Sequence, residues 1–170
     1  ETVERDNAPA WLFLGQVAED ERKPAEAIGY LQRIDGGELY LPALNRRALL
    51  MARSGDHDGA MKLLDTTEPR TAQERQGLVS ARASILRESQ RYQEAFDLLD
   101  KALADNPDSP ELLYDQAMAA EKIGRLEALE KSLRHLMTLQ PDNAHAFNAL
   151  GYTLADRNLR LDEARQLIEK

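Results

Sequence analysis

Apolar residues recur at intervals of three and four along most of this chain, with charged residues between them. The stretches EAFDLLDKALADNP and ALEKSLRHLMTLQP show this spacing most clearly, and it places the apolar side chains on one side of an α-helix. No segment alternates apolar and polar residues as a half-buried strand does. Helix-favouring Ala, Leu, Glu, Arg and Gln are abundant, whereas Val and Ile are scarce. The pattern predicts an all-α protein.

The helical pattern repeats with a fixed period. Pro107 and Pro141 each follow a helical run and lie 34 residues apart, and a proline at such a point ends the helix before it. Gly55 and Gly124 fall midway through their units, where glycine readily takes the left-handed conformation that ends a helix. Counting from the prolines predicts four complete units and a truncated fifth: 8–40, 41–75, 76–109, 110–143 and 144–170. We expect a single repeat domain, 1–170, that is a fragment of a longer array.

Small residues stand at two fixed positions of the units. The eighth position is occupied by Gly15, Ala83, Ala117 and Gly151, with Leu49 departing nearby. The twentieth is occupied by Ala27, Ala60 and Ala95, and by Ala164 if one residue is inserted, with Leu129 departing. A small side chain at each position lets two antiparallel helices approach closely, so each unit is predicted to be a helical hairpin.

The first unit begins PAWLFLGQVA, in which Trp11, Leu14 and Gly15 stand at the fourth, seventh and eighth positions. The last unit repeats this arrangement with Phe147, Leu150 and Gly151. Together with the period, this pattern resembles the tetratricopeptide repeat. The resemblance implies a right-handed superhelical solenoid of helix-turn-helix units, whose inner wall is formed by the first helix of each unit.

Composition and charge exclude several classes of protein. The chain has 170 residues, of which 42% are hydrophobic, so it can bury a core. Its formal net charge of -8 disfavours general binding to nucleic acid. The absence of cysteine excludes disulfides and thiolate metal sites. No apolar run approaches the roughly 20 residues that span a membrane.

Residues that could support catalysis are present, but not in catalytic patterns. His57, His135 and His145 lack the spacing of a helical zinc site, and they are predicted to be surface residues. Carboxylates cluster at 19–21 and 105–111, in loops and at helix starts, where they cap amides. There is no GxSxG motif and no phosphate-binding glycine loop. We expect no enzymatic activity, no cofactor and no metal.

The resemblance places a protein-binding surface on the inner wall, at six positions of each first helix. The first unit contributes Leu12, Phe13 and Gln16 to this wall. The candidate binding residues are Asn45, Arg46, Leu49, Arg53, Ser84, Arg87, Tyr114, Met118, Lys122, Asn148 and Tyr152. Exposed Tyr, Met and Arg are frequent at interfaces. The alternative, that Tyr114 and Tyr152 only pack between neighbouring helices, stays open.

Residues 112–170 carry a closer resemblance. The stretches YDQAMAAEKIGR and PDNAHAFNALGYTLADR, followed by LDEA and LIEK, look like a family of proteobacterial repeat lipoproteins. This resemblance implies a periplasmic protein anchored to the outer membrane by a lipid outside the present sequence. It also implies an adaptor that brings cell-wall hydrolases to a carboxyl-terminal-processing protease.

Two other functions remain open alongside the adaptor. One is an assembly factor for an envelope complex, such as a pilus, a secretion system or outer-membrane machinery. The other is self-association through an apolar end of the stack near Leu161, Leu167 and Ile168. In each case the expected partners are proteins or peptides.

Overall fold

The computed structural model describes residues 7–169, and within that range it contains ten α-helices and no strand. The prediction of an all-α fold is therefore confirmed. The chain divides into two compact units, unit 1 (Glu1–Gln90) and unit 2 (Arg91–Lys170). The boundary lies inside the third predicted repeat, 76–109, between its two helices.

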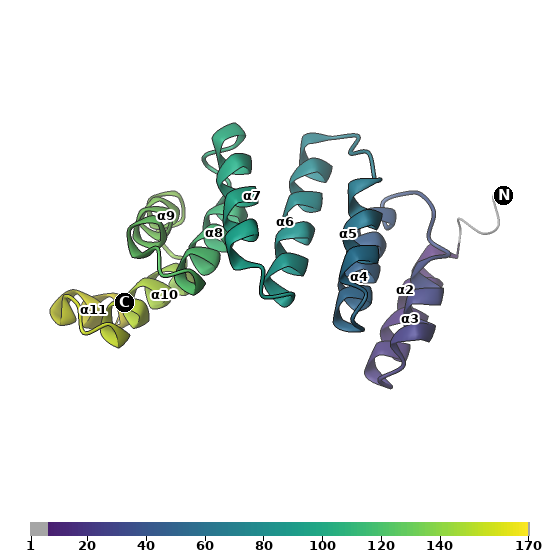
Figure 1. Ribbon diagram of the computed structural model, residues 1–170, viewed down its shortest axis with the longest axis horizontal. Coiled ribbons are helices and arrows are strands. Elements are labelled where there is room, and N and C mark those ends of the chain that lie inside the picture. Colours follow the sequence, from purple (N-terminus) through teal and green to yellow (C-terminus); the bar gives the residue numbers. More distant parts are fainter. Residues whose placement is uncertain (1–6, 170) are drawn as a thin grey trace. The chain divides into compact units, whose positions relative to one another are not determined.

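Unit 1 contains two helical hairpins and the helix that follows them (Figure 1). The hairpins are α2 (Ala8–Asp20) with α3 (Pro24–Leu31), and α4 (Tyr40–Arg53) with α5 (His57–Asp65); α6 (Ala72–Glu88) follows. Helix α4 packs against α3, and α6 packs against both α4 and α5. Helix α6 begins before residue 76, because the Thr71 hydroxyl accepts a hydrogen bond from the Glu74 amide at 3.0 Å and caps an earlier start.

The core of unit 1 lies between consecutive hairpins. Leu31 and Ile34 of the first hairpin are buried together with Ala43 and Leu50 of α4. A second cluster joins the α4–α5 hairpin to α6 and includes Ala60, Leu64, Leu78 and Ile85. Helix α4 therefore buries one side against α5 and another against the preceding hairpin, and α6 buries a side against the α4–α5 hairpin.

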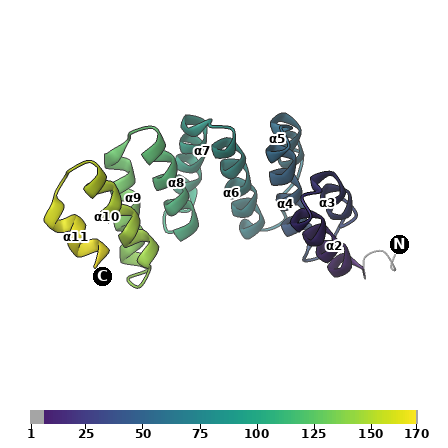
Figure 2. The same cartoon turned by 90° about the horizontal axis from the view of Figure 1, so that it is seen from below.

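Unit 2 follows the same scheme (Figure 2). Its helices are α7 (Tyr92–Asp105), α8 (Pro110–Lys122), α9 (Leu126–Leu139), α10 (Ala144–Asp156) and α11 (Leu161–Ile168). Helix α7 packs on α8, which pairs with α9; α9 packs on α10, which pairs with α11. The largest fully buried side chains are Leu99, Leu112, Leu129, Leu133, Leu136, Leu150 and Leu154.

The predicted small positions lie where helices approach most closely. Gly151 shows why, because a Cβ atom there would lie 2.7 Å from Ile168 Cγ1 and 3.1 Å from the Ala164 carbonyl oxygen. One assignment needs correction. In the second repeat the small buried residue is Ala48, which is fully buried, whereas Leu49 is the next residue and is half-buried. The eighth position of this repeat therefore keeps the pattern.

The repeat period is also visible in the backbone of the turns. Arg22, Gly55, Gln90, Gly124 and Asn158 follow the first helices of the five predicted repeats, and their φ angles are 60°, 98°, 59°, 74° and 54°. This left-handed conformation is favourable for glycine and costs other residues about 1–2 kcal/mol. The two glycines are the clearest sequence signals of these turns, because Arg and Gln rarely adopt this conformation and Asn does so less readily than Gly.

The helix boundaries have local causes. The side chains of Asp56, Ser109 and Asn143 accept hydrogen bonds from the amides three residues later, at 2.9 Å, 3.4 Å and 3.2 Å. They cap α5, α8 and α10. Helices α7 and α9 end at Asp105 and Leu139, shortly before Pro107 and Pro141, as the sequence predicts.

Candidate protein-binding face

The candidate residues lie on four first helices and fall into two groups, one in each unit. We call Asn45, Arg46, Leu49 and Arg53 of α4, with Ser84 and Arg87 of α6, the unit 1 face. We call Tyr114, Met118 and Lys122 of α8, with Asn148 and Tyr152 of α10, the unit 2 face. Apart from the adjacent Asn45 and Arg46, the residues on each helix are spaced by three or four, so they lie on one side of it.

On the unit 1 face, Arg46 is already engaged by α2. Its guanidinium forms an ion pair with the Glu19 carboxylate and donates a hydrogen bond to the side-chain oxygen of Gln16. From the sequence, Arg46 is a candidate for binding a partner. The structure instead uses it to connect two consecutive first helices, α2 and α4.

Arg53 makes the corresponding connection from α4 to α6. Its Nε and Nη2 atoms lie 3.3 Å and 3.1 Å from Glu88 Oε1. On α6, Arg87 Nη2 lies 3.5 Å from Ser84 Oγ. The arginines of the unit 1 face therefore have intramolecular partners, and their attraction for an acidic peptide is reduced.

Asn45 also faces a neighbouring helix. A Cβ atom at Gly77 of α6 would lie 3.9 Å from Asn45 Nδ2. Asn45 Oδ1 and the nearby Ser80 Oγ are buried, and they have no hydrogen-bond partner within residues 7–169. Asn45 therefore faces α6 within unit 1. Leu49 is half-buried.

The unit 2 face has a different character, because its most exposed member is aromatic. The side chain of Tyr152 is 57% exposed, and Lys122 is also exposed. Tyr114, Met118 and Asn148 are half-buried. Tyr114 and Asn148 occupy one repeat position in consecutive repeats, and Met118 and Tyr152 occupy another. The unit 2 face therefore offers an aromatic ring, a thioether, an amide and an ammonium group.

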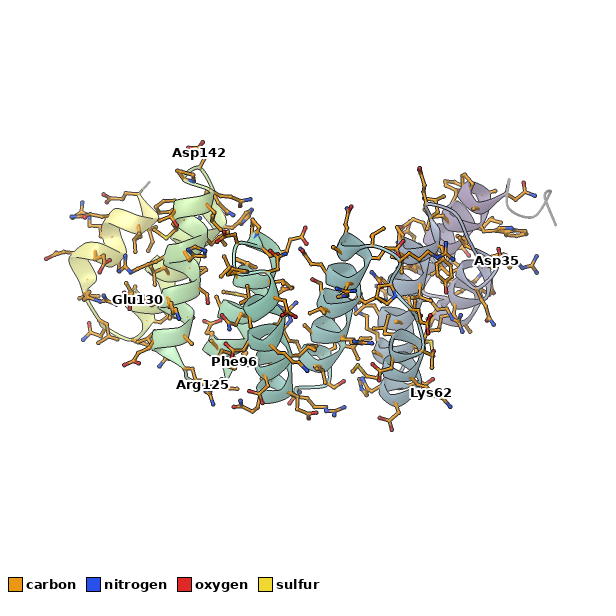
Figure 3. The ribbon with its side chains drawn as sticks, turned by 90° about the horizontal axis from the view of Figure 1, so that it is seen from above. Asp35, Lys62, Phe96, Arg125, Glu130 and Asp142 are labelled. Atoms are coloured by element: carbon orange, nitrogen blue, oxygen red, sulfur yellow. The ribbon has the colours of Figure 1, made fainter. Side chains whose placement is uncertain are left out.

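Four charged side chains that are not candidates in the sequence connect α9 to the start of α11. Arg134 contacts Glu130 at 2.8 Å and also pairs with Glu163. Arg160 binds Glu130 at 2.5 Å and lies 3.5 Å from Glu163. Hydrogen bonds from Arg160 and Arg134 lower the pKa of Glu130, which is labelled in Figure 3, to about 2. Such charges are common on helix surfaces, so only the tertiary contacts distinguish these four residues.

Other features of the described residues give no chemical site. His57 Nδ1 lies 2.7 Å from Ser89 Oγ, and His135 Nε2 lies 2.7 Å from Asp108 Oδ1. Arg125 stacks 4.8 Å above the Phe96 ring, and Figure 3 labels both. Residues 7–169 contain no group of three His, Asp or Glu side chains placed to hold a metal ion. In the same range no helix is both long and apolar enough to cross a membrane.

Comparison with known proteins identifies the repeat. Residues 86–151 match the family described as tetratricopeptide repeat. The fold is a solenoid of tetratricopeptide repeats. A tetratricopeptide-repeat-containing protein of Pseudomonas aeruginosa, PA4667, is 36% identical over 161 residues, which make up 95% of this chain. The same alignment covers 27% of that relative, so this chain spans about a quarter of its length.

Solved structures agree on the architecture. MamA of Desulfovibrio magneticus RS-1 superposes with a TM-score of 0.63 and 18% identity, over 96% of this chain and 94% of that chain. A further crystal structure of MamA gives a TM-score of 0.64 and 17% identity, over 92% and 91% of the two chains. At these identities the similarity concerns the tetratricopeptide fold.

Proposed function

We propose that this chain is a protein-interaction scaffold that binds a segment of a partner protein over the unit 2 face. The observation that carries the proposal is the exposure of Tyr152, 57%, on the first helix of a tetratricopeptide hairpin. Tyrosine offers a rigid apolar ring and a hydrogen-bonding hydroxyl, and it is enriched among residues that dominate binding energy. Tetratricopeptide repeats generally mediate contacts between proteins.

The neighbouring side chains supplement the tyrosine. Met118, one repeat earlier at the same position, offers a flexible apolar side chain that adapts to different partner surfaces. Asn148 lies one helical turn before Tyr152 and offers both a donor and an acceptor for a partner backbone. This combination suits an extended peptide or an amphipathic helix.

We further propose that the partner is a periplasmic carboxyl-terminal-processing protease, and that the chain helps to present cell-wall hydrolases to it. The support for this proposal is the resemblance of residues 112–170 to envelope lipoproteins, and those residues include most of α8 and all of α10, which carry the unit 2 face. Periplasmic location and a lipid anchor outside this sequence belong to the same proposal.

The affinity of the chain for the purified protease, measured by calorimetry, tests both the binding face and the identity of the partner. We expect the double variant Met118→Ala/Tyr152→Ala to bind at least about tenfold more weakly than the unmodified chain. Leu161→Ala is the matched control, because Leu161 is an exposed apolar residue of unit 2 outside this face. Arg46→Ala should leave the affinity unchanged, since Arg46 is held by Glu19.

Three outcomes would contradict the proposed binding face or the proposed partner. Equal binding by the double variant would remove the unit 2 face from the interaction. Loss of binding in Arg46→Ala alone would move the site to the unit 1 face. If the protease does not bind at all, crosslinked capture from the cell envelope, compared between the double variant and Leu161→Ala, decides whether the unit 2 face binds another protein. Capture of a pilus, secretion or outer-membrane component would then favour an assembly factor.

A further inference from the structure

One side of α2 is apolar and largely uncovered. Ala10, Leu14 and Val17 are spaced by four and three residues, so they lie on the same side of the helix. Ala10 is exposed, Leu14 is 36% exposed and Val17 is half-buried. We call these three residues the α2 end face.

The other sides of α2 are occupied by its own neighbours. A Cβ atom at Gly15 would lie 3.2 Å from Leu31 Cγ, so α3 covers that side. Glu19 pairs with Arg46 of α4 on the next side. The α2 end face lies away from both contacts, at the edge of the unit 1 helices described by the structure.

In the later first helices of unit 1, the residues equivalent to Ala10 and Val17 are buried, and the position of Leu14 is occupied by the half-buried Arg47 and Arg82. Ala43 and Leu50 follow Ala10 and Val17 by one repeat, and they pack into a core with Leu31 of the preceding hairpin. In α6, Leu78 and Ile85 occupy the same repeat positions and are buried with residues of the α4–α5 hairpin. These positions are therefore the surface with which a first helix docks onto the hairpin before it.

Unit 2 shows the same use of these positions. Leu112 and Ala119 of α8 are buried, and so are Ala146 and Thr153 of α10. Among the five first helices of the described chain, α2 alone has these positions open while keeping them apolar.

The end of a finished repeat stack is normally polar. For comparison, the exposed residues of α11 include the polar Asp162, Arg165 and Gln166 beside the apolar Leu161. The α2 end face has no charged member and so lacks the character of a capping surface. Its composition matches an internal docking surface instead.

We propose that the α2 end face receives the second helix of a further tetratricopeptide hairpin, supplied by the same polypeptide upstream of α2. The required hairpin presents apolar residues to this face, as Leu31 and Ile34 of the first hairpin do to α4. The relative PA4667 is 36% identical, and this chain covers only 27% of its length. The rest of that relative is long enough to contain such a hairpin.

A fusion tests whether the face accepts a hairpin in this register. Residues 1–7 are replaced by a copy of residues 110–143, whose second helix, α9, packs on α10 in the native chain. The junction keeps an asparagine before Ala8, because residue 143 is asparagine, as is residue 7. Leu14→Lys is then introduced into the fused and the unfused chain, and urea unfolding of unit 1 is followed through the fluorescence of Trp11, the sole tryptophan.

We expect the fused chain to unfold at a higher urea concentration than the unfused chain. Leu14→Lys should lower the midpoint of the fused chain by about 1 M and leave that of the unfused chain unchanged, because only the fusion buries Leu14. Leu161→Lys is the matched control, since it changes an exposed leucine of α11 and should affect both chains equally.

Two results would overturn the proposal. One is an equal effect of Leu14→Lys in the two chains, which would mean that no hairpin docks on this face. The other is a concentration-dependent dimer of the unfused chain, seen by light scattering and abolished by Leu14→Lys. In that case a second copy, rather than an upstream hairpin, covers the face.

Discussion

Arg160 donates two hydrogen bonds to the carboxylate of Glu130, thirty residues earlier in the chain: Nη1 lies 2.9 Å from Oε1, and Nη2 lies 2.5 Å from Oε2. Arg160 has a φ angle of 43° and directly precedes α11. The pair therefore holds a strained turn residue against α9. Arg134 and Glu163 complete a four-residue network that fastens the last hairpin to its predecessor.

The Glu130 network predicts an acid-sensitive contribution to stability. The pKa of Glu130 in the folded chain is about 2, below its ordinary value of 4.5, so the unfolded chain binds the proton more readily. The stabilisation is therefore complete above about pH 5 and disappears as the pH falls through 4.5 towards 2. We expect Glu130→Gln to lower the free energy of unfolding at pH 7 by about 1–2 kcal/mol. Solvent screening weakens these ion pairs and brings the expected loss of stability towards 1 kcal/mol, because the side chains of Arg160 and Arg134 are 45% and 42% exposed.

Urea unfolding of the unmodified chain and of Glu130→Gln at pH 7 and pH 3 measures this difference. The gap between the two chains should shrink at the lower pH. Glu94→Gln is the comparison, because a hydrogen bond from Arg91 also lowers the pKa of Glu94 but this pair is more exposed, so its gap and the change of that gap with pH should be smaller. A gap that stays constant with pH would contradict an ionic origin.

Gly151 and Gly29 should respond oppositely to alanine. At Gly151 the new methyl group would meet Ile168 and the Ala164 carbonyl, so Gly151→Ala should destabilise the fold by about 1–2 kcal/mol. Gly29 lies inside α3 with nothing within 4 Å of the new methyl group, so Gly29→Ala should stabilise by about 0.5–1 kcal/mol. Thermal unfolding of both variants checks the prediction. Stabilisation by Gly151→Ala would show that α10 and α11 can separate without cost.

The left-handed turns provide a second matched pair. Gly55→Ala forces a Cβ atom into a φ angle of 98° and should cost about 1 kcal/mol. Arg22→Gly, at a φ angle of 60°, relieves strain but increases the entropy of the unfolded chain, so a net gain of about 0.5 kcal/mol is expected. Denaturant midpoints of the two variants test this. Changes in the same direction would indicate that side-chain contacts, not backbone conformation, decide stability at these turns.

Two buried polar side chains of unit 2, Gln116 and Ser132, should show coupled energetics. Ser132 Oγ donates to Gln116 Oε1, and Gln116 Nε2 donates to Asp100 Oδ1 at 2.9 Å. Ser132→Ala leaves the buried Gln116 oxygen without its donor and should cost about 1–3 kcal/mol. Combining it with Gln116→Leu should cost less than the sum of the two single changes by about 1 kcal/mol.

A double-mutant cycle, measured by urea unfolding, provides that comparison. Thr153→Val is the control, because the buried Thr153 hydroxyl bonds only to the Ala149 carbonyl of its own helix. Its removal should cost about 0.5 kcal/mol or less, since that carbonyl retains its helical partner. Strictly additive costs for Gln116 and Ser132 would mean that the two side chains act independently.

Much of the fold could be predicted from residue spacing. The apolar period, the small residues such as Ala27 and Ala60, and the prolines after α7 and α9 are local signals, because helix formation and helix termination depend on neighbours within a few residues. The prediction for the second repeat was wrong by one residue. Leu49 was assigned to the small position, which Ala48 occupies in the structure.

The binding face was less predictable, because exposure and ion pairing depend on residues far apart in sequence. Arg46 and Tyr152 were equivalent candidates in the sequence. The structure pairs Arg46 with Glu19, twenty-seven residues earlier, and leaves Tyr152 exposed. No local pattern distinguishes a cation that meets an acidic residue on the next helix from one that does not.

The sequence by itself determined that this protein is a series of helical hairpins with a period near 34 residues. Short-range sterics and apolar spacing suffice for that conclusion. Only the tertiary structure decided which side chains the stack uses internally and which it leaves open. That outcome depends on contacts between helices, which join Glu130 to Arg160 and leave the α2 end face and Tyr152 uncovered.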